Sequence, residues 1–247
     1  MRARRPLVLF VLRRTLRIPF MNYLSHGYRF LDQPLFLAGT VVPDWLSVVN
    51  RRVRARKRRV LPVVQTTEDE GIRQVGLGIL QHHHDDDVFH RCELFMQLES
   101  RLAAEFRRHM PDKFDHRPGF LGHIVVELML DHTITTRHPE WLDEFYAAVA
   151  RVDGELVQRA VNQMSLRQTD RLAWFIDRFL EERFLYDYAS DDGMFFRLNQ
   201  VLRRVRLPPM PDACKAVLAF ARELLLEEGW NLLDYVQQHP FERPADV

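Results

Sequence analysis

Histidine and carboxylate side chains, which transfer protons and bind divalent metal ions, gather in three stretches of the 247-residue sequence. The first stretch pairs His26, in MNYLSH, with Asp44, in VVPDWL. The second is QHHHDDDVFH, residues 81–90, and the third is GHIVVELMLDH, residues 122–132. This mixture of histidine nitrogen and carboxylate oxygen suits Zn, Mn or Fe and argues against a thiolate site.

Helical spacing would turn the second stretch into a metal-binding face. Residues four apart lie one above the other on a helix. His82, Asp86 and His90 would therefore form one polar stripe, although HHHDDD also permits the neighbouring pair His83 and Asp87. A solvated surface turn would explain HHHDDD equally well, so this stretch does not decide the question alone.

The third stretch is more informative, because the residues between His123, Glu127 and Asp131 are all apolar. A helix that is apolar nearly all round is buried, and burying three ionisable side chains is costly without partners. A divalent cation would supply the compensation. The ordinary alternatives are a core histidine at His123, a helix cap at Asp44 and a chance pairing of Asp131 with His132. Their joint occurrence favours a metal site.

Helices are the elements expected to position these stretches. Leu, Arg, Glu and Ala dominate, glycines number only ten, and apolar residues recur every four positions, as in 94–106. Asp69 and Asp212 are expected to cap helices, and Pro43 and Pro62 to break them. We expect helices at 22–32, 42–56, 69–90, 92–109, 119–136, 140–164, 168–187 and 212–237, with another short one near 191–205.

The composition indicates one all-α domain, residues 21–240, preceded by a basic N-terminal extension, residues 1–20. The extension is read as a poorly ordered segment, an upstream start before Met21 or a short basic surface anchor. A net charge of +1 provides no global attraction to nucleic acid or membrane. Two distant cysteines and no transmembrane segment fit a cytoplasmic location. Serine-hydrolase and nucleotide-binding motifs are absent.

The order of these motifs resembles the acyl carrier protein phosphodiesterases, bacterial enzymes distantly related to the HD-domain metallohydrolases. MNYLSH, residues 21–26, is similar to the motif with which that family opens. Gly39 and Asp44 then stand in the order of its next motif. The resemblance extends over about residues 21–135.

Two further motifs carry the same resemblance. Gly78, His82 and Asp86 match a glycine–histidine–aspartate series at four-residue intervals, with His90 where the family has a second aspartate four residues further on. The final match is a pair of acidic residues four apart with a histidine directly after the second: Glu127, Asp131 and His132.

The resemblance implies an HD-like helical bundle that hydrolyses a phosphodiester, such as the 4′-phosphopantetheine–serine link of acyl carrier protein. A weaker similarity to zinc-dependent phospholipase C, through its HxxxD and HxxxE pairs, implies the same chemistry on another substrate. A non-catalytic helical metal-binding protein is the remaining alternative. The sequence does not fix which side chains bind the ion and which transfer protons. We assign a divalent metal (Mn, Fe or Zn) to His26, His82, Asp86, His123, Glu127 and Asp131, and catalytic roles to Asp44 and His132.

A basic segment, RRVRARKRR at residues 51–59, contains seven positive side chains in nine positions. An ordinary solvated stretch would explain it. The functional alternative is a docking patch for an acidic protein, to which we assign Arg54, Arg56, Lys57 and Arg58. Acyl carrier proteins are acidic, so this alternative agrees with the resemblance. Nucleic acid is a less favoured partner, because interleaved aromatic residues are lacking.

Overall fold

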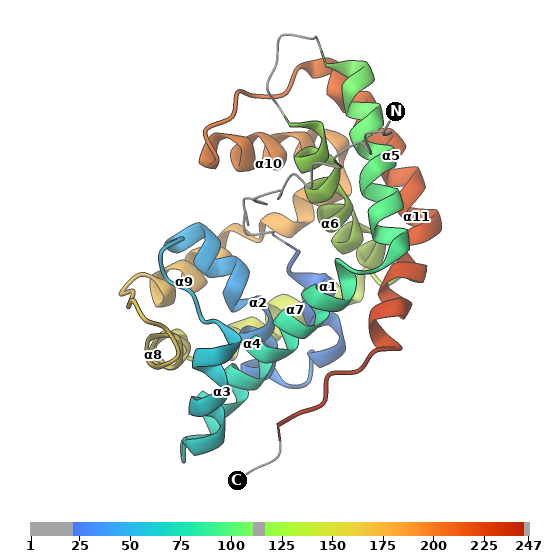
Figure 1. Ribbon diagram of the computed structural model, residues 1–247. Coiled ribbons are helices and arrows are strands. Elements are labelled where there is room, and N and C mark those ends of the chain that lie inside the picture. The colour runs from blue at the N-terminus through green and yellow to red at the C-terminus, as the bar shows by residue number, and fades with distance from the viewer. Residues whose placement is uncertain (1–21, 111–116, 245–247) are drawn as a thin grey trace, which may run out of the picture.

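A computed structural model of the chain describes residues 22–110 and 117–244 (Figure 1). Every regular element in these residues is a helix, which confirms the all-α prediction. The expected extension, residues 1–20, lies outside the described residues. The longer helices are α2 (Pro34–Val49), α3 (Lys57–Thr66), α4 (Glu70–Phe89), α5 (Glu93–His109), α6 (Pro118–Arg137), α7 (Glu140–Ala150), α8 (Gly154–Gln163), α9 (Leu172–Glu182), α10 (Asp191–Arg204) and α11 (Lys215–Gln237). The short ones are α1 (Leu24–Gly27), η1 (Tyr28–Phe30), η2 (Phe184–Ala189) and η3 (Asp212–Cys214).

Helix α6 is the central element of the bundle. It is buried from Leu121 to Ile134 except at His123, as its apolar sequence predicts. Helices α5 and α11 pack against it along one side of the molecule (Figure 1). Helix α1 touches α6 from the other direction, and α2 packs against α1 and α4. The three stretches that carry the candidate ligands therefore belong to neighbouring elements.

The contact between α2 and α4 depends on two glycines. A Cβ atom on Gly78 would lie 2.0 Å from the carbonyl oxygen of Phe36, and one on Gly39 would lie 2.3 Å from that of Val75. No side chain fits at such distances, so glycine is required at both positions for the helices to approach this closely. Gly39 and Gly78 thus set the spacing between two helices that flank the candidate site.

Two of the predicted proline breaks are wrong. Helix α2 begins at Pro34, whose fixed φ suits the first helical position, and continues through Pro43 to Val49. Pro43 lacks an N–H and removes one helical hydrogen bond. Burial of α2 on nearly all sides offsets that loss. Helix α3 likewise continues through Pro62, so the predicted helix at 42–56 is replaced by α2, a loop and α3.

The other predicted helices need smaller corrections. Asp69 caps α4 as expected, because its Oδ1 accepts a hydrogen bond from the backbone N–H of Ile72 at 3.1 Å. Asp212 does not cap α11 but lies within η3. The predicted helix at 140–164 divides into α7 and α8, because Asp153 caps a new helix there.

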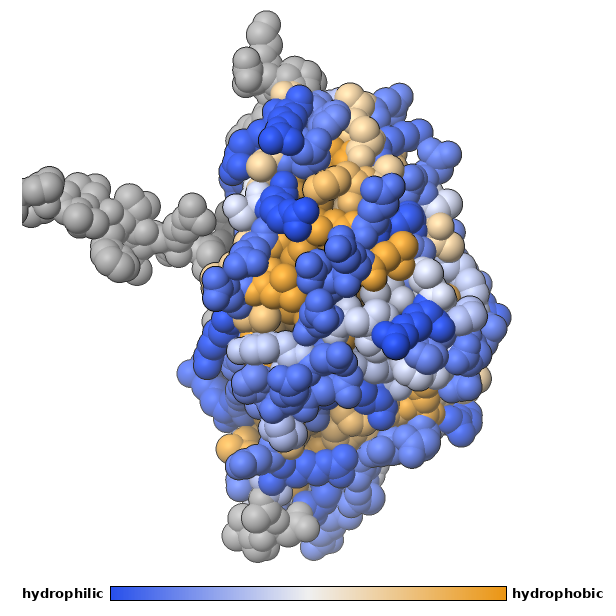
Figure 2. All heavy atoms as spheres, turned by 90° about the vertical axis from the view of Figure 1, so that its right-hand side faces the viewer, coloured by the Kyte–Doolittle hydropathy of each residue, from blue (hydrophilic) through white to orange (hydrophobic). Residues whose placement is uncertain are grey.

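The outer face formed by α5 and α11 carries apolar side chains among charged ones (Figure 2). Met96 of α5 and Leu226 of α11 are the large apolar residues most exposed on these two helices, at 51% and 41%. None of the helices in the described part of the chain combines the length and apolarity that crossing a bilayer requires.

Candidate metal centre

Three of the predicted ligands converge in a first group made by His26 of α1 with His82 and Asp86 of α4. The Nε2 atoms of His26 and His82 each lie 3.6 Å from an oxygen of Asp86. Two ligands bound at about 2.1 Å to a tetrahedral ion are separated by about 3.4 Å, so the spacing fits a shared cation. The prediction that α4 presents His82 and Asp86 on one face agrees with this arrangement.

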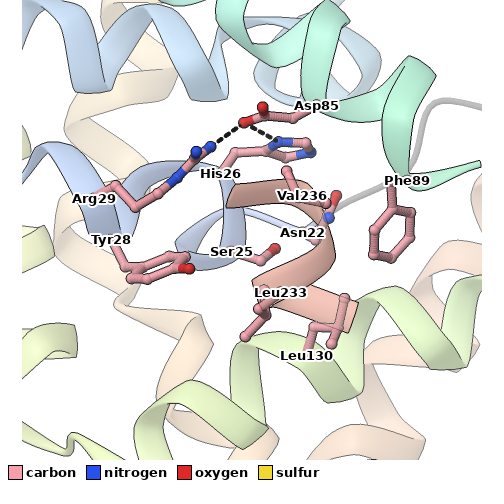
Figure 3. Close-up of a pocket in the computed structure, with 10 residues that line it drawn as sticks. All are labelled: Asn22, Ser25, His26, Tyr28, Arg29, Asp85, Phe89, Leu130, Leu233 and Val236. Carbon is pink, nitrogen blue, oxygen red and sulfur yellow. Dashed lines mark hydrogen bonds and ion pairs between the residues drawn. The ribbon is translucent and has the colours of Figure 1, made fainter. Parts of the chain in front are cut away.

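In both histidines of the first group the other ring nitrogen faces an oxygen atom, at hydrogen-bond distance only in His82. The Nδ1 of His82 lies 2.8 Å from the carbonyl oxygen of Thr40, to which it donates. The Nδ1 of His26 faces a carboxylate oxygen of Asp85 at 3.9 Å. Asp85 is itself held by Arg29, as Figure 3 shows, and by Gln81. Outer partners of this kind fix the ring orientation of metal-binding histidines and leave Nε2 for the ion.

A small cavity of about 20 Å³ lies beside His26, between Asn22 and Leu130 (Figure 3). It has room for about one water molecule, since a bound water needs roughly 10–15 Å³. It is too small to admit an organic substrate.

A second group lies at the C-terminal end of α4, where His90 meets His123 and Glu127 of α6. The Nε2 atoms of His90 and His123 lie 3.4 and 3.3 Å from the same Glu127 oxygen. The Nδ1 of His123 faces Glu99 of α5 at 3.3 Å, which repeats the arrangement of the first group. His123 and Glu127 were predicted ligands, whereas the sequence left His90 ambiguous.

Electrostatics allow two interpretations of these groups. Burial lowers the pKa of His26, but Asp85 and Asp86 outweigh burial and raise it to about 10. Glu127 and Glu99 likewise raise the pKa of His123 to about 9 against the effect of burial. Without a cation, both rings would thus carry a proton and pair with carboxylates. The distances of 3.3–3.6 Å are longer than the usual 2.7–3.2 Å of N–H···O hydrogen bonds and match the separation of two ligands on one ion, so either group could hold a cation.

Asp44 lies within electrostatic reach of both groups without belonging to either. Asp44 belongs to α2 and its side chain is buried, and its Oδ2 has no hydrogen-bond partner among the described residues. Burial raises its pKa well above the usual value; His26 acts in the opposite direction, while Asp86 and Glu127 raise it further. Asp86 and Glu127 belong to different groups, so the charges of both groups act on the Asp44 carboxyl.

Asp131, predicted as a ligand, lies outside both groups. Its two oxygens accept hydrogen bonds of 2.8 Å from the backbone N–H groups of Tyr23 and Ser25. Burial raises its pKa to about 6, although these hydrogen bonds favour the charged form. Asp131 therefore anchors α1 to α6 and so positions His26.

His132, predicted as catalytic, also lies outside both groups. Its Nε2 contacts the hydroxyl of Thr136 at 3.3 Å. Burial, helped by the positive charge of Arg222, lowers its pKa to about 4. The structure thus gives no support to a catalytic role for this side chain.

The ambiguity within HHHDDD is resolved by the basic segment. His83 donates to the carbonyl oxygen of Ala55 at 2.8 Å, and Asp87 pairs with Lys57 at 2.5 Å. This second pair therefore fastens the basic segment to α4 while His82 and Asp86 face inward. Three of the four residues assigned to docking are exposed, and Arg54 is half-buried.

Two positioning residues escaped the sequence analysis, namely Asp85 and Glu99. Asp85 belongs to the aspartate run, and its place four residues after Gln81 was a usable signal. Glu99 lies among the charged positions of α5, and nothing in its local sequence indicates that it faces His123.

Comparison with protein-family models, with curated proteins and with solved structures gives no match. The functional interpretation therefore rests on the geometry of the two groups, and the resemblance to the acyl carrier protein phosphodiesterases stays a prediction.

Proposed function

We propose that the protein hydrolyses phosphodiesters with two adjacent divalent cations. The observation that carries this proposal is the pair of histidine–histidine–carboxylate groups that meet along α4, which contributes His82 and Asp86 to the first group and its C-cap His90 to the second. The groups adjoin, because Asp86 of one group and His90 of the other are one helical turn apart, with the backbone N–H of His90 donating to the carbonyl oxygen of Asp86 at 3.0 Å. Burial opposes ionisation of Asp86, but His82, His26 and His90 hold its pKa well below the usual value. Paired metal ions about 3.5–4 Å apart are common in phosphatases and nucleases.

In this proposal the two groups bind the metal ions, and a separate residue transfers the proton. Each group offers three ligands, which leaves coordination positions for water and substrate. Bound Zn, Mn or Fe would lower the pKa of water towards neutrality and offset the charge of the phosphoryl oxygens. We assign the buried Asp44 carboxyl to accept the proton of the attacking water. Bound cations would favour the ionised form of Asp44 that this role requires, against the burial that raises its pKa.

The basic segment bears on the choice of substrate. Arg56 and Arg58 are exposed, which suits encounter with an acidic protein. Acyl carrier protein, the substrate that the resemblance implies, is acidic. A phospholipase-like enzyme would use the same centre on a lipid, so only substrate assays separate the two.

The test compares two neighbouring aspartates of α4. Asp86→Asn should lower the bound metal, measured by elemental analysis, and abolish hydrolysis of bis(4-nitrophenyl) phosphate. Asp87→Asn is the matched control, since Asp87 is exposed and pairs with Lys57. Holo-acyl carrier protein and a phosphatidylcholine vesicle are assayed beside the synthetic ester.

Three results would count against the proposal. Wild-type protein that binds metal but cleaves none of these esters would be a non-catalytic metal-binding protein. Asp86→Asn protein with its full metal content would remove the first group from the centre. Equal losses in both variants would show that neither aspartate acts specifically.

A further inference from the structure

The cavity of about 20 Å³ beside His26 lies in the interior of the bundle. Helices α4, α6 and α11 contribute to its wall together with the chain from Asn22 to Arg29 (Figure 3). Every lining residue except Arg29 is buried. A molecule in this space would therefore be held by the side chains around it and separated from bulk solvent.

Three of the lining residues each carry a polar atom that has no hydrogen-bond partner among the described residues. These atoms are Oδ1 of Asn22, Oγ of Ser25 and Nε2 of His26. The three residues are only 3%, 8% and 4% exposed. Buried polar groups are normally hydrogen-bonded, because an unpaired one is costly. Three such atoms around one cavity indicate a small polar occupant.

The Ser25 hydroxyl remains able to bind a ligand although it lies near Asp131. The backbone N–H of Ser25 donates to Asp131 at 2.8 Å. Burial raises the pKa of that carboxyl, and the Ser25 hydroxyl is among the groups that lower it. A serine hydroxyl has one hydrogen and two lone pairs. If its hydrogen points towards Asp131, its lone pairs are left for the cavity, as is Oδ1 of Asn22.

The size and the charge of the cavity select water as its occupant. A bound water needs roughly 10–15 Å³ and two to four polar partners, and both conditions are met here. Arg29 and Asp85, the two oppositely charged residues of the wall, pair with each other, so the site favours a neutral molecule. Two acceptor oxygens, on Asn22 and Ser25, match the two O–H groups of one water.

The His26 ring is the group that such a water would hold in place. Its Nδ1 lies 3.9 Å from Asp85 and its Nε2 lies 3.6 Å from Asp86, and neither distance is that of a normal hydrogen bond. The ring of His82, in contrast, is fixed by a contact of 2.8 Å with Thr40. The cavity is space into which the His26 ring could otherwise turn. An occupant bound to the chain removes that freedom.

We propose that Asn22 and Ser25 bind one buried water molecule against His26 and thereby act as positioning residues of the first group. The water needs no metal ion and does not depend on the proposed function. Its effect on His26 rests on that function, because the ring is positioned there for a cation. This water is distinct from the attacking water, since the cavity does not admit a substrate.

A crystal structure of the full chain tests the water directly. Crystals grown with a chelator and crystals grown with Zn²⁺ should both show one ordered water, about 2.5–3.0 Å from Oδ1 of Asn22 and from Oγ of Ser25. Asn22→Leu has nearly the same shape but no acceptor, and this variant should lose the water. An empty cavity in the wild type, or a protein atom bonded to these oxygens in place of water, would overturn the inference.

A Zn²⁺ titration against a competing chelator tests the positioning role. Asn22→Leu should weaken binding of one of the two ions about tenfold, the lower end of the effect typical of outer partners of a metal-binding histidine. The ion of the second group should bind as in the wild type. Ser25→Ala removes a single hydroxyl and should cause a smaller loss of the same kind, which keeps the test decisive if the leucine variant fails to fold. Asn231→Leu is the control, because Asn231 is exposed on α11 and bonds to Glu228 there.

The outcomes separate this inference from the proposed function. Unchanged affinity for both ions in Asn22→Leu and Ser25→Ala would overturn the positioning role. Equal weakening of both ions would indicate a general loosening of the fold and would overturn it as well. Wild-type protein that binds no metal would refute the proposed function together with the positioning role, while an ordered water in the crystal would still confirm the hydration site.

Discussion

Replacement of Gly78 by alanine should separate α2 from α4 and disturb the candidate metal centre, which the substituted residue does not itself touch. The added Cβ would lie 2.0 Å from the carbonyl oxygen of Phe36, whereas carbon–oxygen contacts are normally about 3.3 Å or more. The helices must therefore move apart by about 1.3 Å. The same movement would stretch the 2.8 Å contact between Thr40 and His82 to about 4 Å, beyond a hydrogen bond.

The expected losses follow from these distances. Overpacking costs about 1–3 kcal/mol, and relief of the glycine helix penalty returns about 0.5–1 kcal/mol, so the net loss of stability is about 0–2.5 kcal/mol. Loss of a partner that orients a metal-binding histidine typically costs about 10–100-fold in metal affinity. Urea unfolding and a metal titration against a competing chelator measure the two effects.

Gly119→Ala is the matched control for this variant. Gly119 lies in α6, and no atom of residues 22–110 or 117–244 lies within 4 Å of the position that its Cβ would occupy. This variant should gain up to about 1 kcal/mol from better helix propensity and keep its metal affinity. If Gly78→Ala protein were as stable as Gly119→Ala protein and bound metal equally well, the positioning role of the glycine contact would be refuted.

Three further predictions concern the residues around the centre. Asp131→Ala should lower the free energy of unfolding by about 2–6 kcal/mol, because two buried backbone N–H groups lose their acceptor. The variant should still bind metal through His90, His123 and Glu127. A stable variant that has lost all metal would instead make Asp131 a ligand. The pKa of His132 is about 4 in the folded protein and about 6.5 in the unfolded chain. Acidification from pH 6.5 to 4 therefore protonates this side chain in the unfolded state first, which should lower the free energy of unfolding by about 2–3 kcal/mol. His132→Gln protein should lose less over that range and keep its turnover, and an inactive variant would restore the catalytic assignment. Replacing Arg56 and Arg58 with Glu should slow hydrolysis of an acidic protein substrate and flatten the salt dependence of that rate, because exposed charges act on encounter. Hydrolysis of a small ester should be unchanged. Equal loss on both substrates would mean that the basic segment supports the fold.

The sequence predicted those parts of the centre that depend on local helix geometry. His82 with Asp86, and His123 with Glu127, are four residues apart on one helix, and the helix itself brings each pair together. The burial of α6 also followed from its apolar sequence. These predictions needed no knowledge of how the helices pack.

The remaining assignments depend on tertiary contacts that the sequence does not encode locally. Asp131 has the same four-residue spacing from Glu127, yet it faces α1 and binds backbone N–H groups there. Glu99 orients His123 only because α5 packs on α6. The helix through Pro43 escaped prediction because burial outweighed an unfavourable local residue. Spacing along one helix is therefore more predictable than the partner across an interface.

The anchoring of α1 by Asp131 has a consequence for the order in which the centre assembles. His26 is held in place by hydrogen bonds that span 106 and 108 residues of the chain. His90 lies just before α5, which packs on α6, so His90 and Glu127 are only 37 residues apart in the chain. Contacts between such nearby segments form at a smaller cost in chain entropy. We expect a refolding chain to complete the second group first and to capture one ion there. The group that contains His26 would close last and be the first to open in denaturant.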